Sequence, residues 1–451
     1  MAQGPMLILI LLLTIIFIVI ATSKFKLHPF LSLIVAAYGL AFAAGIPSEK
    51  IAEIITSGFG GTLTSIGIVI ISGTIIGTIL EKSGAAVKMA EIILKVVGEK
   101  RPEIAMSIIG YIVSIPVFCD SGFIILSSLN KSLSKKTKKS LVGMSIALST
   151  GLYATHTLVP PTPGPIAAAA NLKLDNILMV IVIGMIIAIP AVIVGNVFAI
   201  KYASKFAAVD SDEENVKSYE EEVAKYGKLP SAWASFAPII VPILLMAFGS
   251  IAKFPTAPFG NGKLMKLLTF LGTPVNALLV GVIFAFFLLP KLNEETLSGW
   301  IGQGLKDAAI IMIITAAGGS LGSVIKATNV GTYLGESLKT LNAGIFLPFI
   351  IAAALKTAQG SSTVSLVTTS ALMLPLLPSL GLASEMGKVL TVMAIGAGAM
   401  TVSHANDSYF WVVSQFGGMD VKTAYKTQTV ATLLQGVVTI IAVFIASLIL
   451  L

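Results

Sequence analysis

Residues 116–122 read Pro-Val-Phe-Cys-Asp-Ser-Gly and stand between two apolar runs, residues 104–117 and 123–129. A proline and a glycine there should interrupt a membrane helix, and only protein or a water-filled cavity can satisfy the freed backbone groups. Asp120 is an ionisable group at membrane depth, which by default marks a functional site. It could carry a proton, or it could cap the following helix as a hydrogen-bond acceptor. Ser121 and Gly122 beside it are candidate substrate contacts.

A second break covers residues 155–165, where four prolines fall within six positions. Such a run cannot form helix interior, because proline lacks the backbone N–H and clashes with the preceding turn. The prolines are expected to shape the break. The hydroxyls of Thr155, Thr157 and Thr162 are then available to a substrate.

Residues 356–363, Lys-Thr-Ala-Gln-Gly-Ser-Ser-Thr, form a third polar break. A carboxylate substrate needs hydroxyls, backbone N–H groups at helix N-termini and a cation, all held in a site of low dielectric constant. Gln359 and the run 360–363 offer the hydrogen-bond donors, and Lys356 offers the cation. The same small residues also suit close helix packing. Lys356 could instead pair with an acid or extend to the membrane interface.

The fourth break, residues 403–408, contains His404, Asn406 and Asp407. His156 and His404 are two of only three histidines and occupy matching breaks. Titration near neutral pH suits proton symport, although each ring could merely satisfy carbonyl groups of a broken helix. Asp407 is a second candidate for cation or proton coupling, and Asn406 is a candidate for binding substrate hydroxyls. Helix capping is the alternative role for both.

These breaks define one set of candidate residues. The predicted substrate-binding residues are Asp120, Ser121, Gly122, Thr155, His156, Thr157, Thr162, Lys356, Gln359, Gly360, Ser361, Ser362, Thr363, His404 and Asn406, and the predicted proton-coupling residues are Asp120, Asp407, His156 and His404.

Composition determines the class of protein that holds these residues. The chain has 451 residues, of which 55% are hydrophobic and 12% charged, and its mean hydropathy is +0.94. Soluble domains carry about 25% charged residues, so this is an all-α polytopic protein of the cell membrane. Its single cysteine excludes an internal disulfide framework and a cysteine-cluster metal site. The net charge of +8 lies on loop lysines without interleaved aromatic residues, so nucleic acid is not an expected partner. No metal or other cofactor is expected either.

The lysines predict the orientation of the first half. Crossings are expected at residues 6–21, 29–44 and 61–80, with an interfacial helix at 51–60. The positive-inside rule places the loop at Lys24 and Lys26, the basic segment 82–101 and the most basic stretch, 131–139, in the cytoplasm. The 28 residues 103–130 therefore lie between two cytoplasmic segments. They must enter the membrane and return, as a re-entrant hairpin with residues 116–122 at its tip.

The second half repeats this pattern. After residues 140–153, the second break and a return at 176–200, a polar linker covers residues 201–232. Crossings follow at 236–251, 271–289 and 308–325, with an interfacial helix at 294–305. Residues 73–80 resemble 318–325 at an offset of 245, and 155–157 resemble 403–405 at an offset of 248. We expect two repeats, 1–200 and 233–451, joined by a cytoplasmic linker. Each has about five crossings, a re-entrant hairpin and a broken helix, and an odd number of crossings inverts the second copy.

Four stretches also resemble the gluconate permease (gluconate:proton symporter) family: residues 116–126, 159–165, 358–362 and 398–407. The resemblance extends over essentially the whole chain. It implies import of gluconate or a related sugar acid or hydroxy acid by proton symport. Within the wider ion-transporter superfamily it also implies a homodimer with a scaffold and an elevator-type transport domain. Cys119, Thr162 and the lysine-rich segment 127–139 depart from the family pattern, and they leave glycerate, threonate and serine-like compounds open as substrates.

The predicted function is therefore secondary active import of a small carboxylate. Sodium coupling in the same fold is the main alternative, because broken-helix carbonyls with Asn406 could also bind Na⁺. An intramembrane enzyme and a channel are weaker alternatives. The chain lacks a His-Glu-x-x-His motif, and it also lacks the phosphate-binding loop that ATP-driven transport requires.

Overall fold

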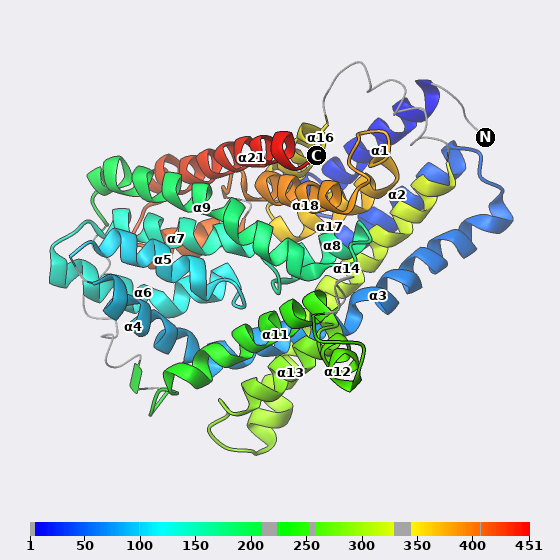
Figure 1. The fold of residues 1–451 in the computed structure, drawn as a ribbon. Coiled ribbons are helices and arrows are strands. Elements are labelled where there is room, and N and C mark those ends of the chain that lie inside the picture. The colour runs from blue at the N-terminus through cyan, green and yellow to red at the C-terminus, as the bar shows by residue number, and fades with distance from the viewer. Residues whose placement is uncertain are drawn as a thin grey trace.

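The computed structural model describes residues 5–98, 100–209, 223–224, 226–252, 258–328, 344–405 and 407–451. These residues form helices joined by turns, and none of them is in a strand (Figure 1). The predicted all-α class is confirmed. Residues 210–222 and 225 of the predicted linker 201–232, together with Asn406, lie outside the described residues.

The first half contains nine α-helices within the described residues. They are α1 (Pro5–Ser23), α2 (Pro29–Ala43), α3 (Ser48–Lys82), α4 (Ala85–Val97), α5 (Pro102–Val113), α6 (Cys119–Thr137), α7 (Leu141–Leu158), α8 (Pro163–Asn171) and α9 (Ile177–Lys201), followed by a short 3₁₀ turn, η1 (Ala203–Lys205).

The second half has a similar series of elements. They are α11 (Ala232–Ala252), α12 (Lys263–Leu271), α13 (Pro274–Phe286), the π-helical η3 (Glu295–Trp300), α14 (Ile301–Ala327), α16 (Phe346–Gln359), α17 (Ser362–Met373), the 3₁₀ turn η4 (Leu374–Leu376), α18 (Glu385–Met400), α19 (Ser408–Phe416), α20 (Val421–Ala424), the π-helical η5 (Tyr425–Thr429) and α21 (Val430–Leu450).

Within the described parts of the chain, four helices are long and apolar enough to cross a membrane. They are Ile177–Lys205, Ala232–Ala252, Glu295–Ala327 and Val421–Leu450. Two bent pairs raise the number to six: the two parts of α3, which meet at 47°, and α12 with α13, which meet at 75°. Other apolar helices within the described ranges have only 10–17 residues, among them α2 and α5.

Three predicted boundaries were wrong. The separate interfacial helices at 51–60 and 294–305 instead continue into the crossings that follow them, in α3 and in η3–α14. Their polar residues suggested separate elements, but no proline stops either helix. The crossing predicted at 271–289 is the shorter α13, because the chain turns sharply at Gly272 and Thr273 before Pro274 begins that helix.

The break predicted at residue 155 begins later. Helix α7 continues to Leu158, so Thr155, His156 and Thr157 lie in its last turn. The chain leaves the helix at Val159, which has an extended conformation, because the residue before a proline is disfavoured in the α region. The interruption between α7 and α8 therefore covers only residues 159–162.

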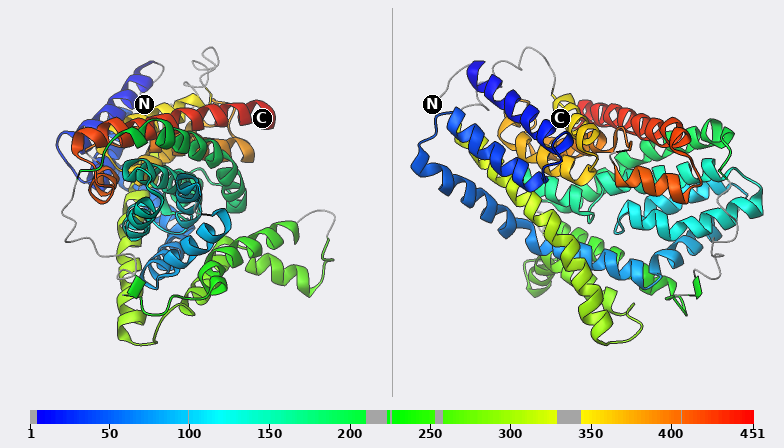
Figure 2. Two further views of the ribbon diagram at one scale, coloured as in Figure 1. Left: turned by 90° about the vertical axis from the view of Figure 1, so that its left-hand side faces the viewer. Right: turned by 180° about the vertical axis from the view of Figure 1, so that it is seen from behind.

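Helices α3 and α14 lie side by side and cross through small residues (Figures 1 and 2). A Cβ atom on Gly58 would lie 2.6 Å from the carbonyl oxygen of Gly319, and one on Gly319 would collide with Thr62. Such contacts let the two backbones approach closely, as small residues do at helix interfaces in membranes.

Further along α3, two glycines face the breaks of the first half. A Cβ atom on Gly73 would lie 2.9 Å from the carbonyl oxygen of Pro161, and one on Gly77 would lie 2.6 Å from that of Pro116. The absence of side chains at these two glycines therefore lets α3 approach the broken backbone segments themselves.

Candidate functional site

Three helices begin at one cavity of about 270 Å³. Residues at the N-termini of α6, α17 and α19 line it, together with side chains from the last turns of α7. The lining residues are Phe118, Cys119, Asp120, Tyr153, His156, Gly360, Ser361, Ser362, Thr363, Asp407, Ser408 and Tyr409. Both predicted hairpins and the second broken helix thus meet at the cavity, and α7 contributes its last turns.

The first tip lies between α5 and α6. Helix α5 ends at Val113, and the Ser114 hydroxyl donates a hydrogen bond to the carbonyl of Val117 at 3.0 Å, which holds the turn. Helix α6 then starts at Cys119 with Phe118 as its N-cap residue, and no side chain caps it. The capping role considered for Asp120 is therefore not present.

Asp120 lies in the first turn of α6 and is partly buried. Its Oδ1 accepts a hydrogen bond from the Ser408 hydroxyl at 3.2 Å, and its Oδ2 accepts a weak one from the Cys119 thiol at 3.7 Å. No Lys, Arg or His among the described residues forms an ion pair with it. Asp120 is thus a carboxylate on the cavity wall with only neutral hydrogen-bond partners.

The second tip lies between α16 and α17. Gly360 ends α16 with φ +89°, a left-handed conformation that favours glycine. Its N–H donates to the carbonyl of Lys356 at 2.8 Å. Ser361 follows as the N-cap of α17, and its hydroxyl accepts a hydrogen bond from the Val364 N–H at 3.2 Å. Two short-range hydrogen bonds therefore fix this tip.

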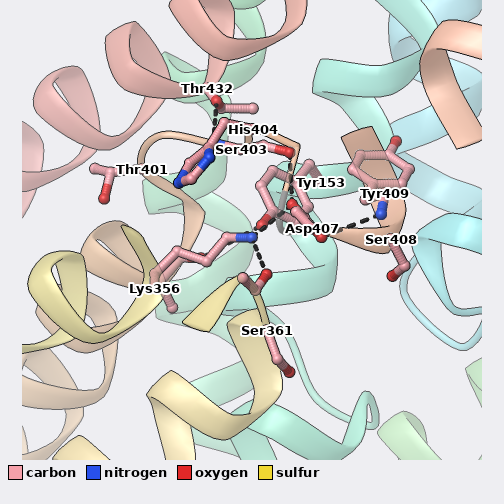
Figure 3. Close-up of polar contacts among 12 residues, drawn as sticks. Tyr153, Lys356, Ser361, Thr401, Ser403, His404, Asp407, Ser408, Tyr409 and Thr432 are labelled. Atoms are coloured by element: carbon pink, nitrogen blue, oxygen red, sulfur yellow. Dashed lines mark hydrogen bonds and ion pairs between the residues drawn. The ribbon is translucent and has the colours of Figure 1, made fainter. Parts of the chain in front are cut away.

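Lys356 is completely buried, with 0% of its surface exposed, so it does not extend to the interface. Its ammonium lies 2.5 Å from Asp407 Oδ2, donates to the carbonyl of Gly360, and stands 5.8 Å from the ring centroid of Tyr153 (Figure 3). Of the roles considered for this lysine, pairing with an acid is the one that the structure contains.

Asp407 is both a helix cap and an ion-pair partner. Its Oδ1 accepts a hydrogen bond from the Tyr409 N–H at 3.1 Å, as the N-cap of α19. Its Oδ2 accepts from the Ser403 hydroxyl at 2.5 Å, in addition to Lys356 (Figure 3). A buried carboxylate with this many donors is held in one orientation.

The two histidines differ in their surroundings. His156 lines the cavity from the helical last turn of α7, and its ring stacks on Tyr153 with centroids 6.4 Å apart. Its Nδ1 has no hydrogen-bond partner among the described residues. His404 lies in the break after α18, with Nε2 2.8 Å from the carbonyl oxygen of Thr357, and does not line the cavity. His404 therefore fits the role of a hydrogen-bond partner for a carbonyl group of the broken helix. His156 is the histidine whose ring lines the cavity.

Three of the predicted threonines, Thr155, Thr157 and Thr162, do not line the cavity. Thr157 donates to the carbonyl of Tyr153 at 3.1 Å, and Thr162 donates to the carbonyl of Val159 at 2.6 Å. Thr155 is fully buried, and its hydroxyl has no partner within the part of the chain that the structure describes. The hydroxyls of Thr157 and Thr162 are thus occupied in holding the end of α7.

The other predicted residues fall into three groups. Ser361, Ser362, Thr363 and Gly360 line the cavity. Ser121 is within hydrogen-bonding reach of Glu81 on α3, and Gly122 packs against Leu152, so both lie behind the tip. The side chain of Gln359 and all of Asn406 lie outside the described residues.

Sequence reasoning missed part of the cavity wall. Tyr153 and Tyr409 were not predicted, although their rings meet at a centroid distance of 5.0 Å and both line the cavity. Each tyrosine stands within three residues of a predicted site residue and is a polar aromatic residue in an apolar stretch. These two features were the signal by which the sequence could have indicated them as site residues. Ser403 and Ser408, the hydroxyl partners of the two aspartates, were missed as well.

No cluster of three or more His, Cys, Asp or Glu side chains within the described ranges is placed to hold a metal ion. The charged groups of the cavity wall and its first neighbours are Asp120, Asp407 and Lys356. The arrangement can therefore hold a small polar solute between two carboxylates, one buried ammonium and three helix N-termini.

A family model described as GntP family permease matches residues 6–449. A permease of Haemophilus influenzae is 35% identical over 458 aligned residues, covering 99% of this chain and 93% of that protein. A gluconate permease of Pseudomonas aeruginosa is 31% identical, covering 100% and 99%. The D-serine transporter DsdX of Escherichia coli is also 31% identical, covering 97% and 98%.

One solved structure has a similar fold. The YdaH transporter of Alcanivorax borkumensis superposes with a TM-score of 0.64, covering 92% of this chain and 97% of that one. The two sequences are 13% identical, so the likeness concerns the fold alone.

Proposed function

This chain belongs to the GntP family of permeases, and we propose that it imports gluconate or a related hydroxylated carboxylate by proton symport. It is a multi-pass protein of the plasma membrane, and a transporter rather than an enzyme, like its named relatives. The gluconate permeases among those relatives support a sugar acid as substrate. The observation that carries the proposal is the cavity at which α6, α17 and α19 begin.

The carboxylate of the substrate binds at the second tip. The N-terminus of a helix carries unpaired N–H groups and a partial positive charge, which attract anions. At α17 this charge is joined by the hydroxyls of Ser362 and Thr363 on the cavity wall, and the buried ammonium of Lys356 lies behind them. Tyr153 and Tyr409 close the other side against the carbon chain of the substrate.

The coupling proton binds to Asp120. Asp407 is already neutralised by Lys356, whereas the donors to Asp120 among the described residues are one hydroxyl and one thiol. Entry of an anion next to an unpaired carboxylate is unfavourable, and protonation of Asp120 removes that repulsion. Binding of the proton and of the substrate thereby favour each other, which symport requires.

Lys356 also supports proton coupling over the sodium alternative. Its ammonium binds one carbonyl and one carboxylate of the second-half breaks, which are the ligands that a Na⁺ ion would need there. At these two oxygens the cation is therefore supplied by the chain itself.

The element order supports two inverted repeats, residues 1–200 and 233–451, joined by a cytoplasmic linker at 201–232. The series of long helix, hairpin, broken helix and long helix occurs as α3, α5–α6, α7–α8 and α9, and again as α14, α16–α17, α18–α19 and α21. In this scheme the hairpins are re-entrant and, with the broken helices, form an elevator-type transport domain. Helices α3 and α14 belong to a scaffold, and the assembly is a homodimer.

A ligand panel tests the substrate class. The unfolding temperature of the purified protein is measured with gluconate, shorter aldonates, hydroxy acids and amino acids at pH 5.5 and 7.5. A ligand at about 100 times its Kd stabilises the native state by about 2.7 kcal/mol. We expect a shift with at least one hydroxylated carboxylate and none with its matched alcohol, such as sorbitol for gluconate. No shift with any carboxylate would overturn the proposal.

Uptake into proteoliposomes tests the coupling ion. An inward proton gradient should accumulate the substrate identified by the panel, and replacement of Na⁺ by choline should have no effect. Accumulation that requires Na⁺ and ignores the proton gradient would establish the sodium alternative instead.

A further inference from the structure

We propose that a second cavity, called here the outer cavity, binds the anionic substrate before it reaches the substrate cavity at the starts of α6, α17 and α19. Lys173 and Lys326 hold the carboxylate of the substrate there. This inference rests on the proposed function, because it takes the transported solute to be an anion that enters from outside.

The outer cavity has a volume of about 310 Å³, which is within the usual range for small-molecule sites. Residues from α3, α14, α17 and the end of α8 line it, among them Ser57, Lys173, Ser323 and Lys326. These helices pack against one another (Figure 1). In the proposed topology α3 begins at the outer face of the membrane, and α8, α14 and α17 end there. The cavity therefore lies on the side from which an imported solute arrives.

The charged residues on the wall of the outer cavity are both lysines. Lys173 and Lys326 are exposed, and neither forms an ion pair with a described residue. No Asp or Glu within the described ranges lines this cavity. Glu385 is engaged elsewhere, since it accepts a hydrogen bond from the Asp175 N–H at 2.9 Å and lies 3.7 Å from Lys388. Two positive charges thus face the cavity without an acid on its wall to balance them.

The positions of these lysines are unusual. The positive-inside rule concentrates lysines in cytoplasmic loops rather than at the outer face. Lys173 also has φ +53°, a left-handed conformation that favours glycine or asparagine after a helix. Helix C-termini carry partial negative charge, so the ends of α8, α14 and α17 would repel an anion if the lysines were absent. Balancing these helix dipoles is the alternative role of the lysines, and the experiments below separate the two roles.

Helices α8 and α17 connect the two cavities. They lie side by side, because the Asn171 amide donates to the carbonyl of Val367 at 3.1 Å and to the Ser370 hydroxyl at 3.0 Å. Thr363, at the start of α17, lines the substrate cavity, and Ala371, near its end, lines the outer cavity. Their separation along the helix is about 12 Å, at about 1.5 Å per residue. The two anion sites therefore lie at opposite ends of one short helix.

The double variant Lys173→Gln, Lys326→Gln tests capture of the anion. Uptake of gluconate, or of the acid that the ligand panel identifies, is measured in right-side-out vesicles at low and high salt. We expect kcat/KM to fall about three- to tenfold at low salt through a higher KM, as loss of electrostatic steering does. The difference should vanish at high salt, because the screening length falls from about 30 Å at 0.01 M to about 3 Å at 1 M.

Two controls belong to this experiment. Lys50→Gln removes an exposed lysine of the same face that does not line the outer cavity, and it should leave kcat/KM unchanged. Efflux of the same acid from the inside should have the same rate in the double variant and in the wild-type protein, because the outer cavity lies at the other face.

A thiol on the cavity wall tests binding without transport. The variant Ser57→Cys is labelled with an anionic (sulfonate) and a cationic (trimethylammonium) methanethiosulfonate. The wild-type protein, whose single cysteine is buried, is the blank. Relative to a free thiol in solution, we expect the anionic reagent to be favoured, and the preference to disappear when both lysines are replaced. Gluconate, or the acid identified by the panel, should slow the labelling, and sorbitol should not.

Each contrary outcome has its own meaning. A lower unfolding temperature of the double variant with unchanged kcat/KM at low salt would assign the lysines to the helix dipoles and overturn the inference. Protection of the thiol by short-chain phosphatidylglycerol but not by a transported acid would assign the cavity to a lipid headgroup, which also overturns it. Both results leave the proposed function standing, whereas a panel in which no carboxylate binds would overturn both. The labelling of Ser57→Cys keeps both lysines, so it decides the matter even if the double variant does not fold.

Discussion

The two hairpin tips reach the same cavity by different means and carry different charges. The first tip turns through Pro116 and presents Asp120, a carboxylate with hydroxyl and thiol partners. The second turns through Gly360 and encloses a completed ion pair between Lys356 and Asp407. The first tip thus carries a charge that a mobile ion can neutralise. The second tip encloses an ion pair that is already neutral and is fixed to the chain. The difference suggests that coupling and substrate binding are divided between the two halves.

The largest effect on stability and uptake is expected from breaking the ion pair between Lys356 and Asp407. Lys356→Met leaves Asp407 buried without its cation, and breaking a buried ion pair from one side costs about 3–5 kcal/mol. We expect a large loss of folded protein and no uptake. Thermal unfolding followed by size-exclusion chromatography measures the first effect, and proteoliposome uptake measures the second.

The double variant Lys356→Met, Asp407→Asn is the control for that experiment. It removes both charges and should recover most of the stability without recovering transport. A single variant Lys356→Met with wild-type stability would show that the pair does not hold the second tip.

Asp120→Asn should give the second largest effect, confined to coupling. The amide keeps an acceptor for Ser408, so stability should change by about 1 kcal/mol or less. Without a proton carrier, the variant should exchange internal for external substrate but not accumulate it against a gradient. Counterflow and gradient-driven uptake, measured on one preparation, separate the two activities. If the variant accumulated as much substrate as the wild-type protein, Asp120 would not be the residue that couples transport to protons.

The third largest effect is expected from disturbing the contact between α3 and the first tip. Gly77→Ala places a Cβ atom 2.6 Å from the carbonyl oxygen of Pro116, and such overpacking costs about 1–3 kcal/mol. We expect slower uptake, because the tip that carries Asp120 is displaced. Gly67→Ala on the same helix is the control, since the nearest atom to its Cβ would be the sulfur of Met312 at 3.7 Å. Equal rates in the two variants would argue against a role for this contact.

The smallest effect is expected from Ser408→Ala. It removes an exposed hydroxyl of the second half that donates to Asp120 at 3.2 Å. A hydrogen bond of this kind changes affinity by about two- to tenfold. The KM of uptake should rise by that factor while the number of protons per substrate stays constant. A changed proton count would place Ser408 in the coupling step.

The sequence predicted the polar breaks and their chemistry better than their geometry. Prolines, glycines and charges in apolar runs located both tips, because such residues are costly in lipid unless protein surrounds them. The pairing of Lys356 with Asp407 was one of several open roles, since 51 residues separate them and only tertiary packing selects the partner.

The misplaced boundaries have a common physical origin. Helix α7 continued through His156 because nothing before Val159 prevents helical hydrogen bonding, whereas the polar residues had suggested an earlier end. Likewise Ser121 was predicted in the site together with Asp120, but adjacent residues of a helix point about 100° apart. Its side chain accordingly faces Glu81 rather than the cavity.

The ammonium of Lys356 differs from a dissociable ion in one thermodynamic respect: it is attached to the chain. Over a full transport cycle it returns with the empty carrier, so its net displacement is zero and it does no work on the substrate. It can make single steps sensitive to voltage but cannot alter the final concentration ratio. With one proton per monovalent acid, the solutes released inside carry no net charge. The membrane potential then contributes nothing, and each pH unit is worth about 1.4 kcal/mol, a tenfold accumulation.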